Sequence, residues 1–274
     1  MDASLALAHQ DGILAAAIAY ARVAPTIFLL PILNGNVLSG VVRITVSMWM
    51  AVGVWPYPYG APLALNGPVG AVLLREAGVG LLLAVALAFP FWVFHALGAY
   101  IDNQRGATLS SVIDPANGVD TSEFAGFCQW FGAVIYLHLG GMSWLLEVLA
   151  RSYRVCEPFG GCVLSAARVY ELLDGLVGHA IALSAPVVAA LFLSEMVLGL
   201  LSRFAPQVNA FALSLTIKSA IAFAVVLIYF SATLPDALVA RVMRPEDVVR
   251  WLSPTSPTSP TSPTSPVQPA GIER

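Results

Sequence analysis

The fold class is decided by Ala210–Leu234, which reads AFALSLTIKSAIAFAVVLIYFSATL. This stretch contains a single charged residue, Lys218, and exceeds the ~20 apolar residues that cross the hydrocarbon core of a bilayer. Its apolar residues run on without the period-two alternation of a membrane barrel strand. Because a helix satisfies every backbone polar group within its own segment, the stretch predicts a membrane-type helix.

The whole chain has the composition of such helices. Of its 274 residues, 58% are hydrophobic and 11% are charged, and the mean hydropathy is +0.80. Soluble domains carry about a quarter charged residues, so the surplus apolar surface requires lipid or other helices as its surroundings. The net charge is −3, and no basic run is interleaved with aromatic residues, so nucleic acid is not expected as a partner.

Five further apolar stretches precede this one, and each is near or above spanning length. They run from Ile13 to Leu33, Val37 to Trp55, Val69 to Tyr100, Phe124 to Ala150 and Leu176 to Leu201. We therefore predict an all-α integral membrane protein of six long, kinked, mostly apolar helices arranged as hairpins.

The sequence changes character after Trp251. Residues 253–266 repeat Ser-Pro-Thr and end in Ser-Pro. Proline at every third position prevents a helix and favours an extended, solvated chain. We predict a helical domain over 1–252 and a disordered tail over 253–274, which is either a plain extension or a docking segment.

Several charged residues lie inside the apolar stretches, namely Arg22, Arg43, Glu147, Glu195 and Lys218. A charge at the bilayer centre costs at least ~2.5–3.5 kcal/mol on insertion scales, so such side chains face protein or water. The helices are therefore expected to pack against protein, in this chain and in partner chains. Glu195 and Lys218 either pair across the last two helices, or Glu195 serves in a proton relay.

No catalytic constellation is present, and an enzyme is not expected. Nucleotide loops and nucleophile motifs are absent from the sequence, and the histidines inside the apolar stretches (His95, His138 and His179) lack metal-ligand spacing. We predict neither a cofactor nor a metal.

The three cysteines leave two interpretations open. Cys128, Cys156 and Cys162 form no CxxC pair. They are free thiols packed among apolar groups, or Cys156 and Cys162 form a disulfide, which requires an oxidising compartment.

Three strings in the polar connections carry a family resemblance. They are IDNQRGA at Ile101–Ala107, DPANG at Asp114–Gly118, and SEMVLGLLSRFAPQVNAF at Ser194–Phe211. With the length and the six apolar stretches, they resemble the T subunit of the type III secretion export apparatus, the SctT family (SpaR, YscT and HrcT), which is related to flagellar FliR. The resemblance covers residues 10–250; the Ser-Pro-Thr tail is not part of it.

The resemblance implies a passive function. A T subunit joins R and S subunits in a gate of helical hairpins in the bacterial inner membrane, raised toward the periplasm, and unfolded proteins pass through its centre. The U switch protein and the V export subunit lie on the cytoplasmic side, and membrane lipids surround the assembly. Two alternatives are a flagellar FliR-like subunit and a secondary transporter, which would be built from inverted repeats.

The resemblance also nominates site residues. In this family the loop after the third apolar stretch contributes a plug to the closed pore, which here falls on Val112, Ile113, Asp114, Pro115, Ala116, Asn117 and Gly118. Residues expected to contact other subunits or to fix the hairpins are Asp102, Arg105, Glu195, Arg203 and Lys218.

Overall fold

The computed structural model describes residues 2–33, 37–59, 67–106, 122–160, 167–204 and 210–252. Within these ranges the chain is helical and contains no strand, which confirms the all-α prediction. The helices are α1 (Asp2–Leu29), the 3-10 turn η1 (Pro31–Leu33), α2 (Gly40–Val54), α3 (Val69–Arg105), α5 (Glu123–His138), α6 (Gly141–Val155), α7 (Ala167–Phe204), α8 (Ala210–Val239) and α9 (Asp247–Leu252). The predicted plug (112–118) and the predicted tail (253–274) lie outside the described ranges.

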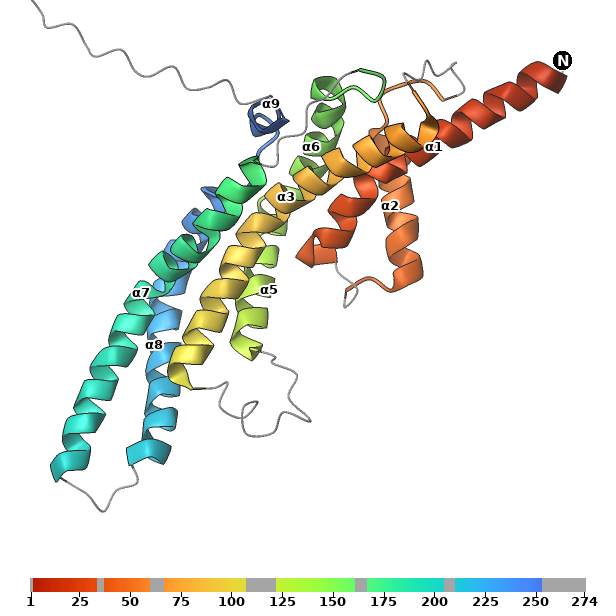
Figure 1. Ribbon diagram of the computed structural model, residues 1–274. Coiled ribbons are helices and arrows are strands. Elements are labelled where there is room, and N and C mark those ends of the chain that lie inside the picture. The colour runs from red at the N-terminus through yellow and green to blue at the C-terminus, as the bar shows by residue number, and fades with distance from the viewer. Residues whose placement is uncertain are drawn as a thin grey trace, which may run out of the picture.

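Helix α3 is the central element. It packs against α1 near its start and against α5 and α7 along the rest of its length, and α7 in turn packs against α8 (Figure 1). Of the most apolar part of α3, 67% is buried within the chain. Helix α3 therefore buries most of its apolar surface against other helices of the same chain.

Two glycines of α3 lie where neighbouring helices cross it. A Cβ at Gly80 would lie 2.8 Å from the carbonyl carbon of Arg22 in α1, and closer still to its oxygen. A Cβ at Gly98 would lie 2.5 Å from the Cα of Ala125 in α5. Because both approaches involve backbone atoms, the crossings of α1 and α5 over α3 depend on residues without side chains.

The fourth apolar stretch is one element in the prediction but two in the structure. Helix α5 ends at His138 and α6 begins at Gly141, with a bend of 77° between them. Gly140 has a φ of 83°, in the left-handed region that favours glycine, and this conformation ends a helix. The Gly140–Gly141 pair therefore breaks the stretch.

The second stretch is also shorter than predicted. Helix α2 has 15 residues and is about 22 Å long, below the thickness of a hydrocarbon core. Among the described residues, four helices (α1, α3, α7 and α8) are long and apolar enough to cross a membrane, and the bent α5–α6 pair makes up to five. The molecule therefore has the helices of a multi-pass membrane protein.

The cysteines separate the two interpretations of the sequence. Cys128 is buried and free in α5, as predicted for a packed thiol. Cys156, which follows α6, is disulfide-bonded, so the free-thiol interpretation is wrong at this position. Cys162 itself lies outside the described residues.

Candidate functional site

One buried carboxylate joins the end of α3 to the start of α5. In the sequence, the predicted plug lies between these two points. Asp102, in the last turn of α3, accepts hydrogen bonds from Arg105 Nε (2.7 Å), from the Phe124 backbone N–H (3.0 Å) and from the Ser122 hydroxyl. The Ser122 Oγ also accepts a hydrogen bond from the Ala125 N–H at 3.2 Å, which caps the start of α5. We call Asp102, Arg105 and Ser122 the Asp102 anchor.

The electrostatics of the anchor are favourable. A carboxylate beside the first turn of a helix interacts with the unsatisfied N–H groups and the positive end of the helix dipole. The Arg105 guanidinium, 2.6 Å from Asp102, provides the opposite charge. Gly106, with a φ of 79°, then ends α3. The anchor therefore fixes both chain ends from which residues 107–121 extend.

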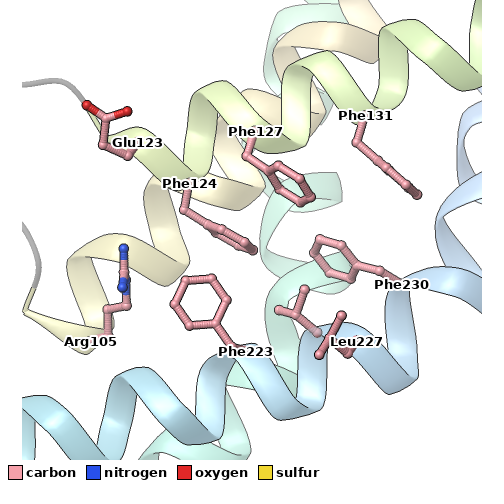
Figure 2. Close-up of a pocket in the computed structure, with 9 residues that line it drawn as sticks. Arg105, Glu123, Phe124, Phe127, Phe131, Phe223, Leu227 and Phe230 are labelled. Atoms are coloured by element: carbon pink, nitrogen blue, oxygen red, sulfur yellow. The ribbon is translucent and has the colours of Figure 1, made fainter.

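A groove lined by phenylalanines lies next to the anchor. Figure 2 shows Phe124, Phe127 and Phe131 of α5 facing Phe223 and Phe230 of α8. The cavity between them has a volume of about 620 Å³, and the Arg105 and Glu123 side chains stand at one end of it.

The rings pack in specific pairs across this groove. Phe124 meets Phe223 edge-on at 5.7 Å and stacks on Phe230 at 6.1 Å, and the Arg105 guanidinium lies 5.3 Å from the centre of the Phe223 ring. Aromatic and cation–π contacts therefore hold α8 against the start of α5 and the end of α3, and such contacts favour defined geometries.

The α7–α8 hairpin carries the second predicted polar group. Lys218 of α8 donates a hydrogen bond from its Nζ to Oε1 of Glu195 in α7, so these residues pair across the hairpin. The side chain of Lys218 is 12% exposed and that of Glu195 is 44% exposed. Arg203 lies exposed in the last turn of α7, shortly before residues 205–209, which are outside the described residues.

A further polar cluster was not predicted from the sequence. Arg22 of α1 and Glu76 of α3 form an ion pair at 2.6 Å, and both side chains are 0% exposed. The Arg22 guanidinium also donates to the Ser152 hydroxyl at 3.2 Å and to the Cys156 carbonyl at 2.6 Å, and it lies 4.1 Å from the centre of the Tyr153 ring. This Arg22 cluster ties α1, α3 and α6 together.

A neighbouring arginine extends the cluster to the turn that follows α6. Arg75 lies 3.7 Å from the Glu76 carboxylate and donates hydrogen bonds to the backbone carbonyls of Pro158 and Gly160. Three helices and one turn therefore meet around the buried Arg22–Glu76 pair, although within the described residues Glu76 Oε1 accepts no hydrogen bond. Such groups fix a unique arrangement of helices, because any other packing leaves a charge unpaired.

The amino-acid sequence is similar to those of known proteins over most of its length. Residues 13–241 match the family described as bacterial export proteins, family 1. The chain belongs to this family. It is 49% identical over 237 residues to the surface presentation of antigens protein SpaR of Salmonella typhimurium, which covers 86% of this chain and 90% of that protein.

Two further relatives are less similar and align over less of the chain. The Yop proteins translocation protein T of Yersinia pestis is 32% identical over 209 residues, covering 73% of this chain and 80% of that protein. The flagellar biosynthetic protein FliR of Bacillus subtilis is 28% identical over 162 residues, covering 57% of this chain and 62% of that protein. The predicted resemblance to the T-subunit family is therefore confirmed.

The structure brings the nominated residues of this export protein together in two places. Asp102 and Arg105 form one site, and Glu195 and Lys218 form the other, while Arg203 stands apart from both. The sequence contains a signal for the Arg22 cluster, although the cluster was not predicted. Arg22 is a basic residue within one apolar stretch, and Glu76 is an acidic residue within another. Pairing the two required knowing that α1 crosses α3 at Gly80.

Proposed function

We propose that this chain is a structural and gating subunit of the protein-export channel of a type III secretion system. The observation that carries the proposal is the family match over residues 13–241, together with 49% identity to SpaR across most of both chains. The weaker and shorter similarity to FliR favours a secretion system over a flagellum. The channel would lie in the bacterial inner membrane and pass unfolded proteins, with R and S subunits as its other components.

The exposed apolar surface of the hairpin supports a role inside an assembly. Only 28% of the most apolar part of α7 and 17% of that of α8 are buried within the chain. Large side chains such as Phe192, Met196 and Leu227 are therefore uncovered along its length. A surface of this extent is covered by lipid, by partner helices, or by both.

The plug belongs to the same proposal. Residues 112–118 would close the pore, and the Asp102 anchor would hold the two ends of the loop that carries them. A fixed base confines a short loop to a small volume, which lowers the entropic cost of keeping it in the pore. The U and V subunits would act on the cytoplasmic side, and the energy for export would come from other components.

Deletion of residues 110–118 tests the gating role. We expect the purified assembly containing the shortened chain to conduct ions in planar bilayers at rest, and we expect cells carrying it to secrete poorly. The matched control is deletion of 253–261, which removes the same number of residues from the Ser-Pro-Thr repeat. Unchanged conductance with normal secretion after the loop deletion would remove the plug assignment.

The subunit role has a separate test. The full chain is extracted in mild detergent, and the proteins bound to it are identified by mass spectrometry. We expect R and S subunits in defined ratio. A stable, lipid-surrounded monomer with a complete transport activity of its own would contradict the proposal and would favour a secondary transporter.

A further inference from the structure

A second cavity, of about 360 Å³, lies where α7 begins and α8 ends. The chain between α8 and the end of α9 closes it on one side, and α3 and α7 close it on the other. Its lining is unlike that of the phenylalanine groove, because it combines basic and apolar side chains. The basic ones are Arg241, Arg250 and His179, and the apolar ones include Phe89, Leu172 and Trp251.

Of the three basic residues in this lining, Arg241 is the one with a buried side-chain nitrogen that lacks a hydrogen-bond partner in the described part of the chain. One guanidinium nitrogen donates to the Ala237 carbonyl at 2.7 Å, but within the described part of the chain its buried Nε has no hydrogen-bond partner. Burial also lowers the pKa of Arg241, because the cation is poorly solvated there. A bound anion would satisfy the Nε–H and restore favourable surroundings for the charge.

The other polar groups of the cavity leave its charge positive. Among the described residues of the lining, Asp247 is the only acidic one, and its Oδ2 accepts a hydrogen bond from the Arg244 backbone N–H at 3.1 Å. The Nδ1 of His179 donates to the Gly175 carbonyl at 2.6 Å, so its Nε2 is the ring nitrogen left for a ligand. The lining therefore carries two arginines and one carboxylate, and that carboxylate already accepts a hydrogen bond.

The apolar wall determines what kind of anion fits. Phe89 meets the His179 ring edge-on at 6.1 Å, which places an aromatic ring beside the basic groups. A fully hydrophilic anion would gain nothing from Phe89, Leu172 and Trp251, and an apolar ligand would leave Arg241 unsatisfied. An amphiphile with an anionic head and an acyl chain uses both parts of the lining.

The position of the cavity along the hairpin favours a lipid. The apolar stretch of α8 ends at Leu234, and Arg241 follows it about 10 Å further along the chain direction. Tryptophan and arginine are typical of the region where helices leave the bilayer, and basic pockets between membrane helices bind anionic headgroups. We propose that this cavity binds the phosphate headgroup of an anionic phospholipid, with the start of an acyl chain against Phe89 and Leu172.

Binding to the purified full chain in detergent tests the site. Phosphatidylglycerol, phosphatidylcholine and inorganic phosphate are titrated separately, and binding is followed by native mass spectrometry and by the midpoint of thermal unfolding. We expect phosphatidylglycerol to bind and to raise the midpoint more than phosphatidylcholine does. The variants Arg241→Gln and Arg250→Gln should each weaken its binding about fivefold, since a basic residue near anionic lipid contributes about that factor.

The controls separate the alternatives. Arg154→Gln removes the same charge from an exposed position in the last turn of α6 and should leave lipid binding unchanged. Arg250 is exposed, so its variant tests the site even if Arg241→Gln fails to fold. Equal binding of the two lipids, or full binding by the Arg250 variant, would overturn the proposal. Inorganic phosphate binding as tightly as the lipid would assign the arginines to a soluble phosphate and overturn the lipid part.

Discussion

Among the described residues, two ion pairs join neighbouring helices in opposite surroundings. Arg22–Glu76 joins α1 to α3, and both side chains are 0% exposed, whereas Lys218–Glu195 joins α8 to α7 with its carboxylate 44% exposed. The helices around them differ in the same direction, because α3 is mostly buried within the chain and α7 and α8 are mostly not. One half of the molecule completes its own core, and the other half presents its apolar surface outward.

This difference teaches where the fold depends on itself and where it depends on other molecules. A fully buried pair whose arginine is also hydrogen-bonded to Ser152 and to the Cys156 carbonyl fixes a helix crossing within the chain itself. A partly exposed pair on the surface of the hairpin is expected to add little to the stability of the isolated chain. We therefore expect mutations around Arg22 to act on folding and mutations on the hairpin to act on assembly.

The largest expected effect is that of Glu76→Ala. It leaves the Arg22 guanidinium buried without its anion, and loss of one partner of a buried pair costs about 3–5 kcal/mol in the free energy of unfolding. Unfolding of the full chain in detergent can be followed by tryptophan fluorescence, since the Trp55 ring lies 5.6 Å from Tyr153 in the Arg22 cluster.

Two comparisons sharpen this prediction. Glu147→Ala removes a solvent-exposed pair with Arg151 and should cost no more than about 0.5 kcal/mol. The double variant Arg22→Leu with Glu76→Leu removes both charges and should be more stable than either single variant, because no charge is left unpaired. An unfolding free energy of Glu76→Ala equal to that of Glu147→Ala would show that water reaches the cluster.

A second prediction compares glycines of the two halves. At Gly80, the Cβ of an alanine would collide with the Arg22 backbone, so Gly80→Ala should destabilise the chain by about 1–3 kcal/mol. At Gly178 in α7 nothing lies within 4 Å of that Cβ, and alanine is the better helix former by up to about 1 kcal/mol. Opposite signs in thermal unfolding are expected. Equal destabilisation by both substitutions would contradict the proposed difference in packing.

The sequence predicted the exposed half of the molecule better than the buried half. Length and apolar continuity are local properties, so the stretches of α7 and α8 were predicted as helices, although α7 begins nine residues earlier and α8 ends five residues later than predicted. The pair across α7 and α8 was also anticipated, because two helices joined by a short turn lie side by side. The Arg22 cluster joins positions far apart along the chain, and no local pattern states which helices cross.

The sequence also did not predict where an apolar stretch breaks into two helices. Gly140 and Gly141 were visible in the sequence, but glycine pairs also occur inside continuous membrane helices. The 77° bend requires the left-handed conformation of Gly140, and a hydropathy pattern carries no information about φ. The Asp102 anchor was predicted only as a polar contact, because its partners Ser122 and Phe124 lie across the loop.

Lys218→Ala is expected to destabilise the isolated chain less than Glu76→Ala and Gly80→Ala do. The side chain of its partner Glu195 is 44% exposed on the surface of the isolated chain, so we expect the unfolding free energy in detergent to fall by less than about 1 kcal/mol. In the proposed assembly, partner helices would cover the hairpin and leave Glu195 buried and unpaired, which costs about 2–5 kcal/mol. Co-purification of R and S subunits with the variant should therefore drop sharply while its melting temperature stays near that of the native chain. Glu195→Gln, which removes the uncompensated charge, should restore co-purification when combined with Lys218→Ala. Normal recovery of the complex from Lys218→Ala alone would mean that this part of the hairpin faces lipid or water in the assembly, and that the contrast between the two ion pairs concerns the fold only.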